Sequence, residues 1–496
     1  MLDLIREEAN LSFTENGAVS QASTGSACLD LFATIGALRH ASESEIILRF
    51  IRSFAENPDL AMKLLFYARD VRGGLGERRV FRIILGWLAQ HEAAAVRKNL
   101  HHVADFGRFD DLLVLLGTPC EEAMLELLKG QLEEDLEALA SGAPVSLLAK
   151  WLPSINASNA KTVRQAKRLA AALGYNAAGY RKMLVALRAR IELMENSLRR
   201  RSYDFDYEKQ PAKAMFKYRK ALMRNDGERY RSFLARVRSG KAQLHTETLA
   251  PYELVSPCLA GFWNSTERAF LRPLSEAEKE VLNTTWAALP AYGSSENALA
   301  VIDTSASMYW NSRPTPAAVA LSLGLYFAEH NTGPFQNCFI EFSRRPQLIE
   351  IKGETFVDRL HYVASFNEVA NTNLEAVFDL LLRAALRGRA SQSELPARLV
   401  IISDMEFDAC VENGGASNFM NAREKYAAYG YRLPEIIFWN VDSRSRQQPV
   451  TRNEAGVALV SGVSPRLFEM IASGELSPWR MMMDVLMSGR YAGIAV

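Results

Sequence analysis

Carboxylate and hydroxyl side chains alternate directly after an apolar run in the second half of the chain. The run "ALAVI" (298–302) leads into Asp303, and Ser305 and Ser307 follow at alternate positions. This alternation lets one turn direct three oxygen-bearing side chains to one point, while the residues between them face away. Oxygen ligands favour a hard cation such as Mg²⁺ or Mn²⁺ over zinc or copper. The stretch therefore predicts part of a divalent-metal site, with hydroxyls that merely cap a helix as the alternative.

Polar residues at two other places could complete this site. The apolar run "RLVIISD" ends in Ser403 and Asp404, and Thr372 lies just before a helix expected to begin near Leu374. If the apolar runs are strands of one doubly wound sheet, the loops after them gather at one rim. The predicted metal ligands are Asp303, Ser305, Ser307, Thr372 and Asp404.

The elements that would position these residues are apolar runs that alternate with amphipathic helices. From residue 295 onward, runs such as "NALAVID", "NCFIEFS" and "EIIFWNV" are separated by helical patterns such as "AAVALSLGLYFAEH" and "NLEAVFDLLLRAAL". This order is typical of a doubly wound, Rossmann-like α/β domain, in which helices cover both faces of a parallel sheet. Ligands of such folds bind at the carboxyl ends of the strands, which is where Asp303 lies.

The first half of the chain has apolar residues at helical spacing instead. Segments such as "LAMKLLFYARDV" and "VFRIILGWLAQH" predict many amphipathic helices joined by short turns. Such a pattern favours an α-helical repeat array of the HEAT type. The expected domains are a helical region (1–248), a connecting segment of irregular pattern (249–294) and the α/β domain (295–496).

Positive charge is concentrated late in the helical region. The whole chain has a net charge of +1, but residues 181–241 contain 18 Lys and Arg against 7 Asp and Glu. Such polarisation predicts an anionic partner, nucleic acid being the first candidate, and a solvated helical hairpin is the alternative. The predicted RNA-binding residues are Arg181, Lys182, Arg199, Arg200, Arg201, Lys213, Lys217, Lys220 and Arg224.

Four of these cations fall on one face of a helix that is expected from Pro211. Lys213 is followed by the others at offsets of 4, 7 and 11 residues, with no acid between them on that face. A cationic stripe of this kind could contact phosphates. The neighbouring apolar stripe, expected to pack on the array, consists of Ala214, Tyr218, Ala221 and Leu222. The three consecutive arginines from Arg199 end the preceding helix, where cations also stabilise a helix C-terminus.

Two glycine-containing segments in the helical region could also do chemistry. "RDVRGGLGERR" (69–79) has glycines and four arginines that could bind phosphate, but it follows a helix and lacks the Lys-Ser/Thr ending of a P-loop. A helix-turn-helix corner, with Asp70 and Glu77 binding the arginines internally, is the favoured interpretation. "GRFDD" (107–111) is likewise expected to be a capped corner rather than a catalytic acid pair.

Composition excludes several classes of protein. The 496 residues, 48% hydrophobic and 23% charged, predict a globular protein of two or three domains. The sequence shows no membrane-spanning run and an N-terminus unlike a signal peptide. Five scattered cysteines without a CxxC pair predict reduced, mostly buried thiols in a cytoplasmic protein, and the seven histidines have no zinc-like spacing.

The "DTSAS" stretch, the later threonine and "ISD" together resemble the metal-ion-dependent adhesion site of von Willebrand factor type A domains. The resemblance covers about 295 to 496. It implies that Ser305, Ser307 and Thr372 ligate the metal, and that Asp303 and Asp404 act through water. In this family the metal keeps one position open, which an acidic residue of a partner can fill.

The N-terminal half carries a second resemblance. "TENGAVSQASTGSACLDLF", "LLFYARDVRGGLGERRVFR", "FGRFDDLL" and "KAMFKYRKAL" look like a family of large proteins of unknown function that pair a helical region with this A domain. The architecture is also similar to that of TROVE proteins of the Ro autoantigen type, in which a ring of HEAT-like helices binds small or misfolded RNA. RNA binding is therefore implied by analogy and by the basic segment.

These observations predict a non-enzymatic RNA-binding scaffold. Its basic helices would bind RNA, and its A domain would bind Mg²⁺ (or Mn²⁺) and an acidic protein partner, with no membrane involved. The alternative is a metal-dependent protein-interaction adaptor or co-chaperone without RNA. Metal-dependent phosphoryl chemistry is disfavoured, because acid-rich phosphatase motifs need a carboxylate where Ser305 stands.

Overall fold

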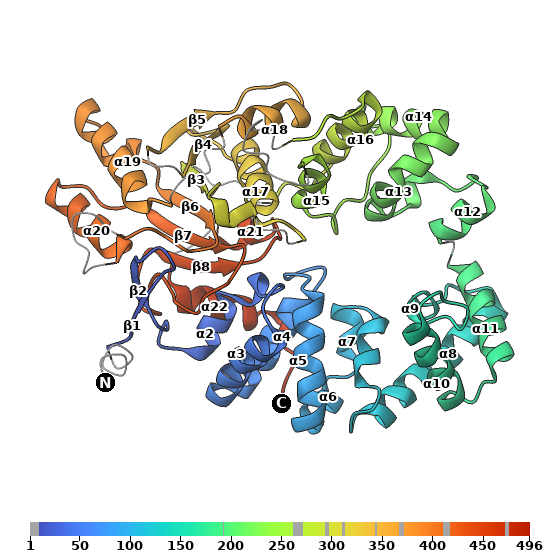
Figure 1. Cartoon of the computed structure of the whole chain (residues 1–496). Coiled ribbons are helices and arrows are strands. Elements are labelled where there is room, and N and C mark those ends of the chain that lie inside the picture. The colour runs from blue at the N-terminus through green and yellow to red at the C-terminus, as the bar shows by residue number, and fades with distance from the viewer. Residues whose placement is uncertain are drawn as a thin grey trace.

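The chain folds into a helical region followed by a domain with a parallel-rich sheet, as the sequence predicts (Figure 1). The computed structural model describes residues 9–191, 193–260, 271–292, 297–309, 313–342, 345–366, 372–409, 417–471 and 476–496. Among them, no helix is long and apolar enough to cross a membrane.

The helices of the first half form a curved array, in which consecutive helices pack on one another (Figure 1). Several begin where the sequence places a capping side chain: Ser42 accepts a hydrogen bond from the backbone of Glu45, and Asn57 accepts one from Leu60. These helices are α2 (Ala27–Phe32), α3 (Glu43–Glu56), α4 (Pro58–Arg69), α5 (Arg78–His91), α6 (Ala93–Lys98), α7 (His102–Phe106), α8 (Glu121–Ser141), α9 (Leu148–Trp151), α10 (Ala160–Ala172), α11 (Ala177–Arg190), α12 (Met194–Arg200), α13 (Ala212–Asn225) and α14 (Gly227–Arg238). Between α7 and α8 lies the 3-10 helix η2 (Phe109–Leu115).

The second half contains a six-stranded sheet of order β5-β4-β3-β6-β7-β8. All neighbouring strands are parallel except β4 and β5. The expectation of an all-parallel sheet is therefore wrong at this edge, because the connection from β4 to β5 is too short for a parallel crossover. The strands are β3 (Ala298–Ile302), β4 (Cys338–Glu341), β5 (Gln347–Glu350), β6 (Arg398–Ser403), β7 (Glu435–Asn440) and β8 (Val457–Ser461).

Each face of the sheet is covered by helices, as the buried strands predict. One face, with Leu299 and Val301, packs against α19 (Leu374–Gly388) and α20 (Asn418–Ala428). The other face, with Ala300 and Ile302, packs against α17 (Pro316–His330) and shares one continuous hydrophobic core with the helical region. The remaining helices of the domain are α18 (Phe356–Ala364), α21 (Leu467–Ile471) and α22 (Pro478–Leu486).

The helical region, taken together with the connecting segment that follows it, contacts the sheet domain at both ends. Near its start, α2 packs on β8 and on α22, and at its end α15 (Pro251–Val255) packs on α17. The array therefore leaves the sheet domain and returns to it, which gives the ring-shaped outline in Figure 1. The two ends also meet directly, because the Arg39 side chain hydrogen-bonds to that of Tyr252.

Three further features differ from, or add to, the sequence expectations. The described part of the connecting segment is largely helical, with α15 and α16 (Glu276–Ala287) packed on the sheet domain's helices. An N-terminal hairpin, β1 (Leu11–Phe13) and β2 (Val19–Gln21), lies on the sheet domain. The four described cysteines, Cys28, Cys120, Cys258 and Cys338, are free and buried as expected, and Cys410 lies outside the described residues.

Candidate metal centre and nucleic-acid interface

Asp303 and Asp404 follow the two central strands of the sheet. β3 and β6 are neighbours, with Ile302 paired to Ile402. From β3 the chain continues to β4 on one side, whereas from β6 it continues to β7 on the other side. Open α/β sheets bind ligands in the crevice that such a reversal leaves at the carboxyl ends of the strands. Both aspartates are therefore at the usual ligand position of this fold.

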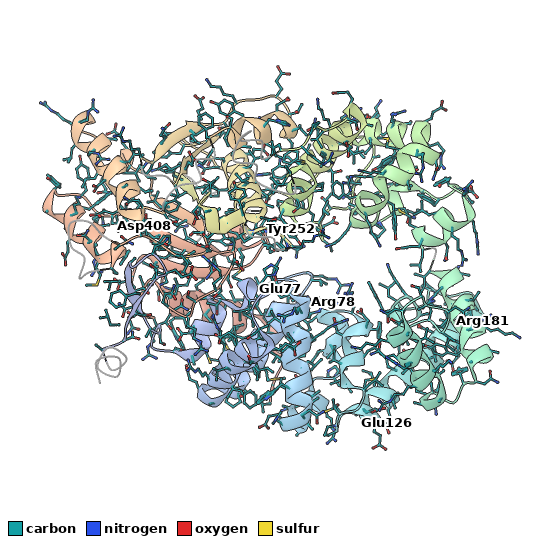
Figure 2. The ribbon with its side chains drawn as sticks, viewed as in Figure 1. Glu77, Arg78, Glu126, Arg181, Tyr252 and Asp408 are labelled. Carbon is teal, nitrogen blue, oxygen red and sulfur yellow. The ribbon has the colours of Figure 1, made fainter. Side chains whose placement is uncertain are left out.

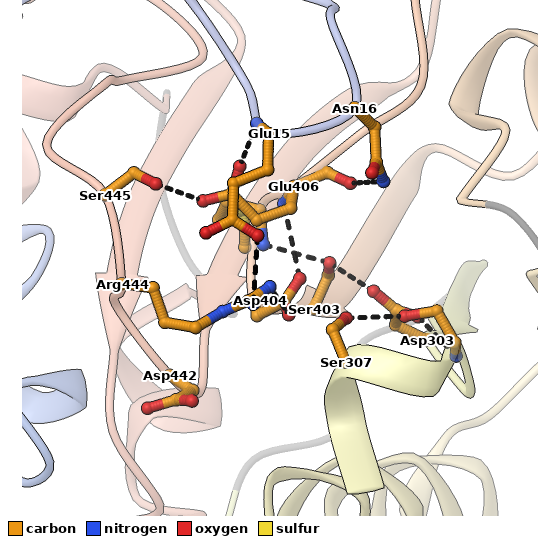
Figure 3. A network of polar contacts seen from close by, with 12 residues as sticks. Glu15, Asn16, Asp303, Ser307, Ser403, Asp404, Glu406, Asp442, Arg444 and Ser445 are labelled. Atoms are coloured by element: carbon orange, nitrogen blue, oxygen red, sulfur yellow. Dashed lines mark hydrogen bonds and ion pairs between the residues drawn. The ribbon is translucent and has the colours of Figure 1, made fainter. Parts of the chain in front are cut away.

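Hydroxyl groups surround the fully buried carboxylate of Asp303 (Figure 3). The Ser403 hydroxyl donates to Asp303 Oδ2 at 2.6 Å, and the backbone N–H of Ser305 donates to Asp303 Oδ1 at 2.9 Å. The Oγ atoms of Ser305 and Ser307 lie 3.0 Å apart. The turn after β3 thus brings the three side chains of the Asp-x-Ser-x-Ser motif together.

Thr372 lies at the same rim. Its side chain is buried, and its carbonyl oxygen accepts a hydrogen bond from the backbone of Asp408 at 3.0 Å. Asp408 belongs to the segment that Asp404 begins, so this contact holds Thr372 against that segment. All five predicted ligands therefore come from loops that gather at one edge of the sheet.

Negative charge at this edge is only partly compensated. Burial and the neighbouring charge of Asp404 raise the pKa of Asp303 well above its ordinary value. Asp404 itself is paired with Arg444, whose Nη2 lies 2.7 Å from Asp404 Oδ2. Burial also raises the pKa of Asp442, and the negative charge of Asp404 raises it further, to about 6. Arg444 is thus ion-paired with Asp404, and Asp442 is influenced by Arg444 and Arg39, whereas the buried Asp303 is held by hydrogen bonds beside a second carboxylate. This electrostatic situation favours a cation at Asp303.

The N-terminal hairpin extends this polar network (Figure 3). The backbone N–H of Glu15 donates to Glu406 Oε2 at 2.7 Å, and the Asn16 amide donates to the Glu406 carbonyl oxygen at 2.7 Å. The Glu15 carboxylate lies 3.0 Å from Nη1 of Arg444. Arg444 therefore bridges a carboxylate of the candidate site and one of the N-terminal hairpin.

The donor set fits a hard divalent cation. In the described part of the chain, no group of three or more His, Cys, Asp and Glu side chains could hold a metal by itself. A cation here would depend on hydroxyl ligands as well, and Ser305 and Ser307 present theirs next to the buried Asp303. Two carboxylates with hydroxyls suit Mg²⁺ or Mn²⁺, which retain water ligands.

The sequence reasoning missed Arg444 and Asp442, which take part in this network. Both lie in "NVDSRS", the polar run that directly follows β7. β7 is parallel to β6, so its carboxyl end also reaches the rim. A polar run after a third parallel strand was the signal that could have identified them.

Eight of the nine predicted RNA-binding residues lie on three consecutive helices, α11, α12 and α13, and the ninth, Arg201, directly follows α12. All nine are exposed. In Figure 1 these helices form the side of the ring farthest from the sheet, and in Figure 2 Arg181 points outward there. The fold thus gathers these cations into one region, here called the basic rim.

Acids from outside the basic segment reach this region. Lys213 Nζ lies 3.0 Å from Glu253 Oε1, and Lys220 Nζ lies 3.4 Å from Glu278 Oε1. α13 itself has no acid between these cations, as expected, but acids of α15 and of the start of α16 reach two of them. The predicted apolar stripe is also shifted: the buried side chains of α13 are Ala212, Met215, Phe216 and Leu222, whereas Ala214, Tyr218 and Ala221 are only partly buried.

The glycine-rich segment at 69–79 forms a corner between α4 and α5, as favoured from the sequence. The expected pairing of its acids with its own arginines is wrong, however, because Asp70 pairs with Arg490 and Glu77 pairs with Arg39, both from other segments. Gly74 is required there, because a Cβ atom would lie 2.1 Å from the Tyr67 carbonyl oxygen. "GRFDD" likewise forms a capped corner, in which Asp111 accepts from the backbone N–H of Arg108.

Comparisons with known proteins place the chain in a family. The family model described as "Domain of unknown function (DUF2828)" matches residues 14–126 and 122–291, and a second, DUF7788, matches residues 297–478. An uncharacterized protein of Acanthamoeba polyphaga mimivirus is 28% identical over 520 residues, covering 96% of this chain and 87% of its own length. The crystal structure of the RO (RSR) protein of Deinococcus radiodurans is 16% identical, with a TM-score of 0.48, and covers 92% of this chain and 100% of that one.

Proposed function

The chain belongs to the DUF2828 family, and we propose that it is a non-enzymatic scaffold. It binds RNA on the basic rim, and it binds a divalent cation at the carboxyl ends of the sheet strands. The observation that carries the RNA proposal is the gathering of nine exposed cations on α11, α12 and α13 and directly after α12. Lys and Arg side chains that neutralise phosphates provide most of the affinity of sequence-independent RNA binding.

The metal proposal is supported by the geometry at the end of β3. Asp303, Ser305 and Ser307 form one contact group, the charge of Asp404 acts on Asp303, and Thr372 contacts the segment that Asp404 begins. We propose that these five residues hold Mg²⁺ or Mn²⁺ as in a von Willebrand factor type A domain, and that an acidic side chain of a protein partner completes the coordination. When bound, the ion supplies positive charge that anchors such a carboxylate. We assign no catalytic role, because Asp303 is proposed as a ligand rather than a general base.

RNA binding is tested with two charge-reversal variants of the full chain. The double variant Lys217→Glu/Arg224→Glu changes the basic rim, and the matched control Arg383→Glu/Arg387→Glu changes exposed residues of α19. We expect wild type to bind a structured RNA with a steep salt dependence, and the first variant to bind at least tenfold more weakly at about 0.1 M salt. The control should bind like wild type.

The adaptor without RNA is the second candidate, and the pairing of Lys213 and Lys220 with acids favours it. Its distinguishing result is the absence of salt-dependent RNA binding by wild-type protein. Equal loss in both charge-reversal variants would also reject the basic rim as the RNA site, because the effect would then follow net charge alone.

A further inference from the structure

Four arginines converge on two aspartates where α4, α5 and η2 meet. We call this group the arginine cluster: Arg69, Arg78, Arg82, Arg108, Asp110 and Asp111. It lies in the helical region, and its residues do not belong to the basic rim or to the candidate metal centre.

Both aspartates form ion pairs with the arginines, although the buried Oδ1 of Asp110 has no hydrogen-bond partner among the described residues. Asp111 is completely buried, and its carboxylate lies 2.7 Å from Arg69 Nη2 and 2.6 Å from Arg82 Nε. Asp110 Oδ2 lies 2.7 Å from Arg78 Nη2 and 2.8 Å from Arg82 Nη2, and its Oδ1 lies 3.2 Å from Arg108 Nε. Each carboxylate is therefore shared between at least two guanidinium groups.

Positive charge exceeds negative charge in this cluster by two. The nearby Glu77 does not change the balance, since it is itself paired with Arg39. Burial lowers the pKa of Arg78 and of Arg108, and the neighbouring arginines act in the same direction. Partly desolvated charges of one sign raise the free energy of the folded state unless an anion compensates them.

The start of α5 adds to this imbalance. No side chain caps the helix at Glu77, and the first helical residues are the cations Arg78 and Arg79, opposite in sign to those that a helix N-terminus favours. Figure 2 shows Arg78 on the side of α5 that faces the middle of the molecule. Its side chain remains 47% exposed, so a ligand can reach it from there.

Arg108 is held in a fixed orientation. Its guanidinium lies 4.1 Å from the centre of the Trp151 ring, and Lys150 lies over the same ring at 5.3 Å. Stacking of this kind orients the planar donor group and reduces the entropy lost when it binds a ligand. Lys150 thus adds a further cation beside Arg108 at the Trp151 ring.

We propose that the arginine cluster binds the phosphate group of a phosphate ester, with Arg78, Arg82 and Arg108 as its ligands. Guanidinium groups bind phosphate oxygens through paired, charge-assisted hydrogen bonds. An anion with two negative charges balances the excess of the cluster. The phosphate can come from a free nucleotide or from a nucleic-acid strand.

The site is tested by thermal unfolding and titration calorimetry of the full chain with three probes. These are inorganic phosphate, a 5′ mononucleotide and a short single-stranded oligonucleotide, each compared with NaCl at equal ionic strength. We expect inorganic phosphate to raise the melting temperature of wild type beyond the NaCl effect, and Arg78→Gln to weaken phosphate binding at least tenfold. The matched control is Arg79→Gln, because Arg79 donates to the Ala41 carbonyl instead of the cluster.

The relative affinities of the probes identify the source of the phosphate. Tighter binding of the mononucleotide than of inorganic phosphate, with loss in Arg78→Gln, indicates a nucleotide site, and still tighter binding of the oligonucleotide indicates a strand. A second variant, Arg108→Gln, should weaken the same probes, and its melting temperature without ligand reports whether it is folded. The proposal is overturned if phosphate acts no more than NaCl, or if Arg79→Gln loses as much affinity as Arg78→Gln. Loss of RNA binding in variants of the basic rim has no bearing on either result.

Discussion

The Nη2 atom of Arg444 lies 2.7 Å from Oδ2 of Asp404, so a guanidinium from the loop after β7 compensates one of the two carboxylates at the candidate metal centre. The same guanidinium reaches Glu15 of the N-terminal hairpin through Nη1. A cation at Asp303 and Asp404 would lie close to this positive charge. Arg444 and the metal are therefore expected to compete for Asp404.

Removing the Arg444 charge should tighten metal binding. We expect Arg444→Gln to bind Mn²⁺ or Mg²⁺ about three- to tenfold more tightly than wild type, equivalent to roughly 1 kcal/mol of lost repulsion. Titration calorimetry measures the affinity. Arg446→Gln is the matched control, because Arg446 lies two residues away and binds Glu45 instead. Weaker binding in Arg444→Gln would mean that Arg444 orients Asp404 for the metal rather than competing with it.

The metal itself should stabilise the folded chain through Asp303. We expect Mg²⁺ at millimolar concentration to raise the melting temperature of wild type, because a ligand that binds only the folded state adds to its stability. Asp303→Ala should abolish this shift. In Asp379→Ala, which removes a carboxylate of α19 that pairs with Lys425, the shift should remain. A Mg²⁺ effect of equal size in both variants would show that the ion binds elsewhere.

The position of the proposed ligands at the rim could be predicted because it follows from local patterns, whereas their role as metal ligands stays a prediction. The run 298–302 forms β3 with every side chain buried, and Asp303 comes directly after it. The partners of those ligands could not be predicted in the same way. Arg444 contacts Asp404 across 40 positions, and Glu15 contacts Glu406 across 391, so only the folded topology brings them together.

In the helical region, too, the local element could be predicted, whereas its contacts with distant segments could not. α13 covers Ala212–Asn225, close to the helix expected from Pro211, because helical spacing is a property of the segment itself. The acids Glu253 and Glu278 that reach its lysines belong to elements that pack on it from later in the chain. The antiparallel direction of β5 was not predicted either, because its short run, with only one of four side chains buried, gives no information on strand direction.

Close packing between Gly36 and β8 should make the junction of helical region and sheet sensitive to one methyl group. A Cβ atom at Gly36 would lie 2.5 Å from the carbonyl oxygen of Ser461. We expect Gly36→Ala to destabilise the chain by about 2 kcal/mol or more, because backbone must move to relieve the clash. Denaturant unfolding measures the loss. Gly86→Ala in α5 is the control, since nothing lies within 4 Å of its Cβ position, and it should stabilise by up to about 1 kcal/mol. Equal stability of the two variants would contradict the close approach.

Glu45 should make the contact between α3 and the sheet domain dependent on pH. The hydrogen bond from Arg446 lowers the pKa of Glu45 most, burial opposes it, and the hydrogen bond from Arg49 lowers the pKa further, to about 2 in the folded chain. A lowered folded-state pKa contributes stability that is complete above the unfolded value of 4.5 and is lost as the pH falls towards 2. We expect Glu45→Gln to cost about 1–2 kcal/mol at pH 7 after allowance for solvent screening. The difference from wild type, measured by denaturant unfolding, should shrink between pH 5 and about pH 3. Glu43→Gln, at an exposed position of the same helix turn, should show no such change.

The acids beside the basic rim should reduce its affinity for RNA. Glu253 and Glu278 pair with Lys213 and Lys220, and their removal frees both lysines for phosphate. We expect Glu253→Gln/Glu278→Gln to bind a structured RNA about two- to tenfold more tightly, with a steeper salt dependence, because each exposed ion pair contributes only about 0.2–1 kcal/mol. Filter binding at several salt concentrations gives both quantities. Glu126→Gln, an exposed position on α8 that points away from the ring in Figure 2, should leave the affinity unchanged. If the double variant binds RNA no better than wild type, the stripe on α13 does not contact the RNA, and the basic rim must bind through α11 and α12 or not at all.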